Sequence, residues 1–533
     1  MQRTTHFLLA AAMLSALGCG DGSTIGSQTE AAKQAEEPSL VGGSFSTCFW
    51  NYGAVGVEPE FNIAYPDAGA SYWAAYYRRP AGSTLELVGT YPHSRYMSFI
   101  SYDALGQPVD GIADYQIDPD PGSENPFRPG ADRNTPKGQR DYSIQVAHAK
   151  NPGFTIRDPR NDEPPRDTLY TIPTTFMEGG SGFPHRPEVG SDGVTYPVEL
   201  ILYRNYVPDR GFDLTGKVGL PEPILTLADG TVLTGQAACD AMDSESKDLK
   251  VTSGDPDATR LPDPSALLLD DARYSALRYP NELMTGEEVK VFPPPGIPGA
   301  PLFQVGREVA DPVSFPAGYE PNGERSVEWR AQYNRRYLLQ QWTGDDAPGA
   351  ETEPSRTGGG FFPNIHNNYI RAVLHRSFGK VAVVRGKLPT APETQDHRPT
   401  MGAGEVRYAS FCMNESVKTT RVMDCVFDEE VPTDEDGFYT IVVSRIEDRP
   451  KNAKQACGAA WVEWSPRGDG FEDPDFGWFQ IRNMIPDVSF NHAVQNTAVP
   501  GDEIEAMGDY LPNVEYYDSA EDYEALKCAG GAR

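Results

Sequence analysis

The chain has 533 residues, of which 39% are hydrophobic and 23% charged, and its formal net charge is −31. A surface this acidic repels nucleic acid and lacks the basic footprint that such partners need, so nucleic acid is excluded as an expected partner. The length exceeds what one hydrophobic core usually serves and predicts two or three domains.

Residues 1–18 have the features of a secretory signal. Arg3 precedes an apolar run, Phe7–Leu17, that is too short to span a bilayer as a permanent helix. The run ends in ALGC, residues 16–19, which resembles the lipobox of bacterial lipoproteins. The resemblance implies that Cys19 becomes an acylated N-terminus carrying fatty acids such as palmitate, which would anchor the protein in the cell envelope. Because Gly20 follows the cysteine, it also implies the outer membrane if the host has one. Ordinary signal-peptidase cleavage after Gly18, giving a soluble secreted protein, stays open.

Residues 19–48 are polar and rich in small residues, which predicts a flexible tether between the membrane and the first domain. Beyond Cys19 the chain has six cysteines, an even number. In an oxidising compartment they allow three disulfides among fifteen connectivities. The spacing favours a link across a hairpin, a link from the C-terminal tail to the second domain and a link closing the first domain: Cys412–Cys425, Cys457–Cys528 and Cys48–Cys239.

Residues 49–240 are expected to form a first β-sandwich domain. TLELVG alternates around Leu85 and Leu87, and RYMSFISYD and VELILYRNYVP also have the composition of strands. The whole chain contains 52 Gly and 47 Pro, which favours many short strands and turns over helix bundles. Gly82 and its counterpart Gly379 are predicted to supply turns with positive φ.

Residues 241–355 predict a helical and proline-rich linker region. Apolar residues recur at roughly helical spacing in 264–278 and again in 324–342. Between these segments VFPPPGIPGAP, residues 291–301, predicts an extended connector.

Residues 356–528 are expected to form a second β-sandwich that duplicates the first. YWAAYYRRPAGSTLELVGTYP (72–92) aligns without a gap with YIRAVLHRSFGKVAVVRGKLP (369–389), and RYMSF recurs as RYASF. The offset is about 300 residues, which indicates a duplicated domain and not a solenoid. The predicted fold is therefore mainly β, with two duplicated antiparallel β-sandwich or jelly-roll-like domains joined by the linker region.

Five segments carry a family resemblance: YPHSRYMSFISYD, IDPDPGSENPFRPGADR, LYRNYVPDRGFDLTGKVGLP, VVRGKLPT and RNMIPDVSFNHAVQN. In these the chain resembles uncharacterised secreted or lipid-anchored two-domain β-rich proteins of myxobacteria and actinobacteria. The resemblance implies a fold and a location, and it brings no established activity.

No complete catalytic motif is present. The chain lacks GxSxG, HExxH, CxxC and the phosphate-binding GxxxxGK[ST] pattern. Whether the protein is an enzyme therefore stays open, since catalytic groups converge in space and not in sequence.

The strongest candidate site is NIHNNY, residues 364–369, where a loop enters the first strand of the second copy. His366 and Arg371 are the candidate catalytic residues, because a histidine can exchange protons and an arginine can grip a carboxylate. The candidate binding residues are His366, Asn367, Asn368, Tyr369, Arg371 and His93, with the histidines singled out because each occurs in one copy only. A structural reading, with the asparagines capping a turn and Tyr369 in the core, is the alternative.

Both copies keep an arginine, Arg95 or Arg407, and paired aspartates, Asp110 and Asp114 or Asp424 and Asp428. We expect these residues to brace each domain internally. Asp-rich turns suggest calcium as a possible cofactor, with Asp118, Asp120, Asp469, Asp473 and Asp475 as ligands. Such turns also favour aspartate without any ion.

Two functions fit these observations. The first is a cell-envelope lipoprotein that binds a small molecule or glycan in a cleft between the duplicated domains. The alternative is an extracellular hydrolase or lyase that acts on a polymer with carboxylates and His366 at the same interface.

Overall fold

A computed structural model describes residues 48–50, 52–56, 65–102, 108–154, 163–172, 198–242, 244, 327–333, 362–415, 421–469, 473–499 and 501–528. The signal, Cys19, the tether up to residue 47, the helix expected over 264–278 and the connector at 291–301 lie outside these residues. All described residues belong to one compact unit, Gly43–Arg533.

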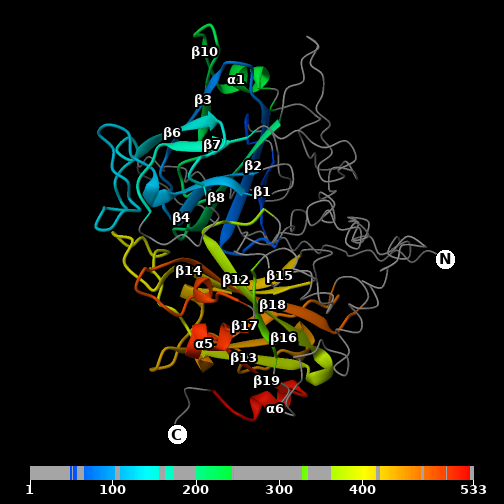
Figure 1. Ribbon diagram of the computed structural model, residues 1–533. Coiled ribbons are helices and arrows are strands. Elements are labelled where there is room, and N and C mark those ends of the chain that lie inside the picture. The colour runs from blue at the N-terminus through cyan, green and yellow to red at the C-terminus, as the bar shows by residue number, and fades with distance from the viewer. Residues whose placement is uncertain are drawn as a thin grey trace, which may run out of the picture. The chain divides into compact units, whose positions relative to one another are not determined.

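The first half is a two-sheet β-sandwich (Figure 1). One sheet has the order β1-β2-β8-β4-β5, formed by Tyr52–Val55, Ala70–Arg78, Val198–Pro208, Ser94–Tyr102 and Pro108–Ala113. The other has the order β10-β9-β3-β6-β7, formed by Val232–Thr234, Glu222–Thr226, Thr84–Thr90, Asp141–His148 and Thr168–Thr171. Leu85 and Leu87 point into the core between the sheets, which confirms the alternation in TLELVG.

The second half repeats this arrangement, except that β10 has no counterpart among its described strands. Its five-stranded sheet, β11-β12-β18-β14-β15, consists of Trp329–Ala331, Asn367–His375, Phe476–Pro486, Val406–Asn414 and Val422–Phe427. Its four-stranded sheet, β17-β16-β13-β19, consists of Ala460–Glu463, Phe438–Ser444, Val381–Lys387 and Asn513–Tyr517. The mainly β fold with duplicated sandwiches is confirmed. Among the described strand pairs, β6–β7 and β16–β17 alone are parallel.

The described α-helices are short and peripheral: α1 (Gly235–Ala241), α5 (Glu503–Met507) and α6 (Ala520–Glu524). Trp329–Ala331, expected to be part of a helix over 324–342, is instead strand β11 and pairs with β12. Trp329 and Ala331 are buried against the second core while Arg330 is partly exposed, so the period-two burial of an edge strand overrides the helical spacing.

The structure contains the three disulfides that cysteine spacing favoured: Cys48–Cys239, Cys412–Cys425 and Cys457–Cys528. Gly82 has the predicted positive φ of 74°. Gly379 does not, because its φ of 161° is extended. Glycine is needed at 379 for space, since an added Cβ would lie 2.6 Å from the Tyr517 carbonyl oxygen.

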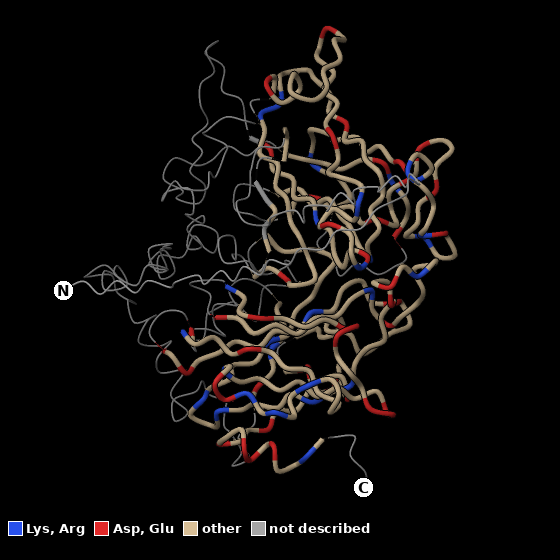
Figure 2. Tube along the Cα trace, turned by 180° about the vertical axis from the view of Figure 1, so that it is seen from behind, with Lys and Arg blue, Asp and Glu red and all other residues tan. Residues whose placement is uncertain are grey.

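Acidic and basic residues are scattered over both sandwiches (Figure 2). None of the described helices is long and apolar enough to cross a membrane.

Candidate ligand site between the two halves

Two equivalent chain segments, residues 65–69 and 362–366, enter the first long strand of each half and bind to the other half. We call them arm 1 and arm 2. Arg482 on β18 donates from Nη2 to the Tyr65 carbonyl of arm 1 at 2.7 Å. In the equivalent contact, Arg204 on β8 donates from Nη2 to the Phe362 carbonyl of arm 2 at 2.8 Å. The two halves are therefore joined by a reciprocal exchange of arms.

Residues in the arms and beside them have positive φ, a backbone conformation that residues other than glycine rarely adopt. Tyr65 and Phe362 have φ of 55° and 47°, and Val207 and Ile485, which lie beside the arms, have φ of 49° and 41°. Positive φ is a genuine outlier for β-branched residues. Val207 N and Ile485 N donate to the carbonyls of Gly69 and His366, so the same strained hydrogen bond occurs once in each half. Strain that is repeated in both copies indicates a conformation the junction requires.

Arm 1 places the Asp67 carboxylate in a complete polar site, the Asp67 half-site. The carboxylate is buried and accepts from Tyr408 Oη at 2.6 Å, Ser410 Oγ at 2.6 Å and Arg482 Nη1 at 2.9 Å. Gly69 N donates to it as well, at 3.0 Å. A buried charge is stable when it is paired and hydrogen-bonded in this way.

Arm 2 builds the equivalent Asn364 half-site from Tyr96, Ser98 and Arg204, but the carboxylate is replaced by an amide. Asn364 occupies the place of Asp67, since each lies five residues before the first tyrosine of its strand, Tyr369 or Tyr72. Five groups of this half-site have no hydrogen-bond partner among the described residues: Ser98 Oγ, Arg204 Nε and Nη1, Asn364 Nδ2 and His366 Nε2. Burial raises the pKa of the Tyr96 phenol, and the nearby Ser98 hydroxyl partly offsets that rise. The contact between the two hydroxyls does not have the geometry of a hydrogen bond.

His366 takes the place of Gly69 and is 1% exposed. Its Nδ1 shares a 2.6 Å hydrogen bond with the Tyr96 hydroxyl, which also donates to Asn364 Oδ1 at 3.3 Å. Burial, reinforced by the charges of Arg166 and Arg204, lowers the pKa of His366 to about 3. The ring is therefore neutral at physiological pH.

Two further candidates lie in β12: Asn367 contacts the first half, whereas Arg371 does not contact the Asn364 half-site. Asn367 Nδ2 donates to Tyr206 Oη at 3.4 Å, and Asn367 Oδ1 has no hydrogen-bond partner within the described residues. Asn368 Oδ1 accepts from the backbone N of Tyr369.

Arg371 donates to Gln480 and Gln332 of its own half and stacks near Trp478 and Tyr65. Burial lowers its pKa to about 10. We therefore regard Arg371 as a packing residue.

His93 is separate from this site. Its ring lies 2.9 and 3.0 Å, at Nδ1 and Nε2, from Arg140 Nη1 and packs edge-on against Phe212. Burial and the charge of Arg140 lower the pKa of His93 to about 4. Its described contacts are with the first half.

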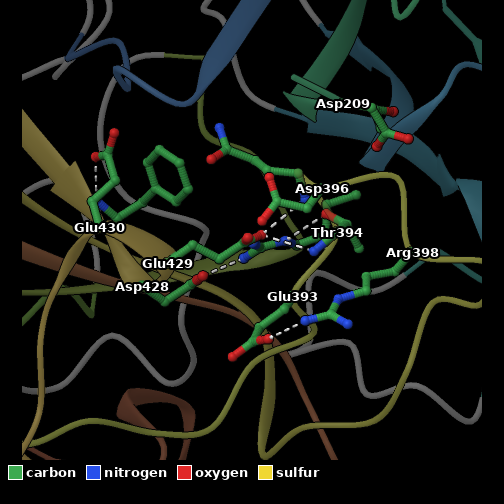
Figure 3. A network of polar contacts seen from close by, with 12 residues as sticks. Asp209, Glu393, Thr394, Asp396, Arg398, Asp428, Glu429 and Glu430 are labelled. Atoms are coloured by element: carbon green, nitrogen blue, oxygen red, sulfur yellow. Dashed lines mark hydrogen bonds and ion pairs between the residues drawn. The ribbon is translucent and has the colours of Figure 1, made fainter. Parts of the chain in front are cut away.

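The arginine and aspartate pairs shared by both copies link the two halves instead of bracing each half internally. Arg95 pairs with Asp428 and Glu429 of the second half, beside Thr394 (Figure 3). Conversely, Arg407 Nη1 lies 3.4 Å from Asp114 Oδ1 of the first half. The expectation of internal pairing was wrong because a repeated sequence cannot distinguish a pair within one copy from its exchange between copies.

The other pair of aspartates behaves differently. Asp110 binds Arg166 within the first half, and Asp424 accepts from the backbone N of Cys425 and Glu463 in the second.

The Asp-rich turns bind their own neighbours. Asp118 accepts from Arg128, Asp120 from Ser143 Oγ, Asp469 from the backbone N of Asp473, and Asp475 pairs with Arg376. Across the described residues, the one group of three metal-ligating side chains is Asp67, Cys412 and Cys425, and those cysteines form a disulfide. The part of the chain that is described therefore gives calcium no support.

Two clusters that contain a histidine were not predicted from the sequence. His375 lies between Ser377 and Asp473, with Nδ1 2.6 Å from Ser377 Oγ and Nε2 3.3 Å from Asp473 Oδ2. His148 Nδ1 lies 2.7 Å from the buried carboxylate of Glu199. Only the one-copy occurrence of these histidines could have drawn attention to them.

No family model and no curated protein matches the chain. Two solved structures are similar to it at low levels. An uncharacterised protein from Burkholderia cenocepacia has a TM-score of 0.34 and 12% identity over 83% of this chain and 80% of its own. The VPA0106 protein from Vibrio parahaemolyticus has a TM-score of 0.33 and 11% identity over 85% of this chain and 90% of its own.

Proposed function

We propose that the protein is a non-catalytic, lipid-anchored protein of the cell envelope that binds a small polar ligand at the Asn364 half-site, between its duplicated β-sandwiches. Membership of the two-domain family of myxobacteria and actinobacteria is part of the same proposal and rests on the quoted motifs. Three disulfides support an oxidising location outside the cytoplasm.

The observation that carries the ligand proposal is the difference between the two half-sites. In the Asp67 half-site, Asp67, Tyr408, Ser410 and Arg482 are all hydrogen-bonded. In the Asn364 half-site, buried donors and acceptors on four residues have no hydrogen-bond partner in the part of the chain that the structure describes. Each such group costs about 1–3 kcal/mol when it is left unsatisfied, so a molecule that satisfies several of them would be bound with a substantial gain.

The test is a thermal-shift screen of the purified protein against polar small molecules, including neutral sugars, amino acids and organic acids. We expect at least one compound to raise the melting temperature saturably, and Ser98→Ala together with His366→Gln to abolish that rise. Ser410→Ala, the matched change in the Asp67 half-site, should keep it. A wild type that responds to no compound class would contradict the proposal.

Anchoring is tested at Cys19. Acylation predicts that the native protein partitions into detergent and that Cys19→Ser leaves it unprocessed or releases it in soluble form. Mass spectrometry of the mature N-terminus would contradict the anchor if it found an unmodified Cys19.

A hydrolase is the second candidate, and the observation favouring it is the Ser377–His375–Asp473 cluster rather than His366. Asp473 accepts from the imidazole, and Ser377 is exposed. That order of groups is the one required to activate a serine hydroxyl. Labelling of Ser377 by a fluorophosphonate, lost in His375→Ala, would support this candidate. Absence of labelling in the folded protein would exclude it.

A further inference from the structure

We propose that β19, the outermost strand of the four-stranded sheet, binds an extended, basic segment of a partner protein along its open edge. This interaction surface is separate from the Asn364 half-site and does not depend on the proposed function. Its basis is the internal duplication, because the first half contains the equivalent strand with that edge covered. The duplicate therefore shows which kind of structure the edge accepts.

β19 corresponds to β9 of the first half residue by residue. Tyr517 of β19 lies opposite Val381 of β13. Thr226 of β9 lies opposite Thr84 of β3, which is the equivalent of Val381 in the alignment of the two copies. Both strands are antiparallel to their neighbour, and both bury their second and fourth residues. The two strands therefore occupy the same place in their sheets.

The outer edge of β9 is covered by β10, which the chain forms by reversing direction. A tight turn with Gly230 at a positive φ of 86° joins the two strands, and antiparallel pairing places Leu233 beside Leu225. In the second half the chain leaves β19 and enters α6, which Ser519 caps. No strand returns along β19, so among the described strands β13 is its one neighbour.

α6 packs on the outer face of the sheet, near β19, and leaves the edge of that strand open (Figure 1). Tyr523 of α6 is buried with Val381 and Val383 on the face of β13 that points away from the core. Within the described part of the chain, the backbone of Asn513–Tyr517 forms hydrogen bonds to β13 alone. The outer N–H and C=O groups of β19 are therefore available to an incoming strand.

The incoming segment needs apolar side chains at alternate positions. In β19 the two buried residues, Val514 and Tyr516, alternate with exposed or partly exposed ones. A strand added beside β19 continues both faces of the sheet, because side chains of neighbouring strands lie side by side. In the first half β10 does so with Leu233, which packs against the core beside Leu225.

Charge selects a basic partner. Four carboxylates are exposed on β19 and directly beyond it: Glu515, Asp518, Glu521 and Asp522. Lysine or arginine on the solvent face of an incoming strand would pair with these groups, since opposite charges on adjacent strands attract. A second copy of β19 would bring like charges together, which disfavours pairing of two copies of the protein through this edge.

The probe is a fluorescently labelled peptide in which valine alternates with lysine. Its binding to the purified protein is followed by fluorescence anisotropy, and we expect the binding to be saturable. The same peptide N-methylated along its backbone keeps the charge but cannot form the hydrogen bonds between strands, so it should bind at least several-fold more weakly. A peptide with glutamate in place of lysine should also bind at least several-fold more weakly.

Variants locate the binding site on β19. Glu515→Lys should weaken binding of the lysine peptide and strengthen binding of the glutamate peptide. Glu222→Lys makes the same change of charge on β9 and is the matched control, which should bind as the wild type does. Insertion of a second copy of residues 227–234, the turn and β10, after Tyr517 supplies the missing strand. That variant should keep a cooperative thermal transition and lose peptide binding.

Absence of binding to the wild type would overturn the inference. Equal binding of the N-methylated peptide would also overturn it, because the interaction would then be charge attraction without strand pairing. Unchanged binding to both Glu515→Lys and the insertion variant would place the peptide elsewhere on the protein. A wild-type dimer that the peptide dissociates would show that a second copy fills the edge, and the assignment of a basic partner would be wrong.

Discussion

His366 and Asn364 are two residues of arm 2 whose counterparts in arm 1 are Gly69 and Asp67, and this pair of differences separates the two half-sites. An added Cβ at Gly69 would lie 2.5 Å from Tyr408 Oη, so arm 1 has no room for a side chain where that phenol binds Asp67. In arm 2 the phenol of Tyr96 shares a shorter hydrogen bond with the His366 ring, at 2.6 Å, than the 3.3 Å bond that it donates to Asn364 Oδ1. The two differences, Asn364 in place of Asp67 and His366 in place of Gly69, therefore both change what this phenol binds.

His366 gives stability a pH dependence with a definite sign. Its pKa in the folded protein, about 3, lies below the usual value of 6.5, so the unfolded state takes up the proton first as the pH falls. Stability from the neutral ring is present above pH 6.5 and is lost as the pH falls toward 3, by up to about 1.4 kcal/mol per pH unit.

We expect His366→Gln to flatten the fall in the free energy of unfolding between pH 6.5 and 4, measured by urea denaturation. Asp114 opposes this trend, because burial raises its pKa to about 6, so the comparison is made between variant and wild type. Val488→Ala on the exposed surface is the control and should keep the wild-type curve. Parallel curves for His366→Gln and wild type would show that the histidine does not titrate in this range.

Six strands differ from ordinary sandwich strands because they are buried on both faces: β2, β4 and β8 of the first half, and β12, β14 and β18 of the second. Every residue of β4 and β18 is buried, although their sequences read as alternating strands. In the first half, one face of these strands lies on its own core and the other packs against Phe362 and Ile365 of arm 2. In the second half, β14 and β18 bind Asp67 of arm 1 through Tyr408, Ser410 and Arg482. Burial of both faces explains why arginines, tyrosines and serines at alternate positions are as buried as the core residues.

The disulfides should contribute according to the length of chain they close. Cys48–Cys239 encloses 191 residues and Cys457–Cys528 encloses 71. The chain-entropy model gives about 5 and 4 kcal/mol respectively. We expect Cys48→Ala with Cys239→Ala to lower the urea midpoint more than Cys457→Ala with Cys528→Ala. The reverse order would show that native packing around the tail disulfide outweighs loop closure.

The strands and disulfides could be predicted from the sequence because their signals are local or are repeated. Leu85 and Leu87 alternate as expected, and the even cysteine count with its spacing favoured the pairs that form. The junction could not be predicted in the same way. Alignment shows that Arg95 and Arg407 are equivalent, but only the fold shows that each binds the aspartate of the other copy. Trp329–Ala331 was placed in a helix because its strand pairing depends on β12, which lies far along the chain.

For the whole molecule, the exchange of arms and ion pairs predicts that the two halves unfold together. Arg95 is fully buried and binds Asp428 and Glu429, so Arg95→Ala leaves two acidic groups without their partner. We expect a loss of about 3–5 kcal/mol and separation of the single calorimetric transition into two.

Arg398→Ala is the control, because its pair with Glu393 is exposed and should contribute less than about 1 kcal/mol. A single, equally cooperative transition in Arg95→Ala would show that the arms alone couple the halves.

The central claim is that the Asn364 half-site binds a small polar ligand through buried groups that have no hydrogen-bond partner among the described residues. A crystal structure of the wild-type protein with a compound that raises its melting temperature tests this claim most directly. The account predicts that the bound molecule lies within hydrogen-bond distance of Ser98 Oγ and Arg204 Nη1. Binding of that compound elsewhere, with both atoms bonded only to side chains of the protein, would contradict the claim.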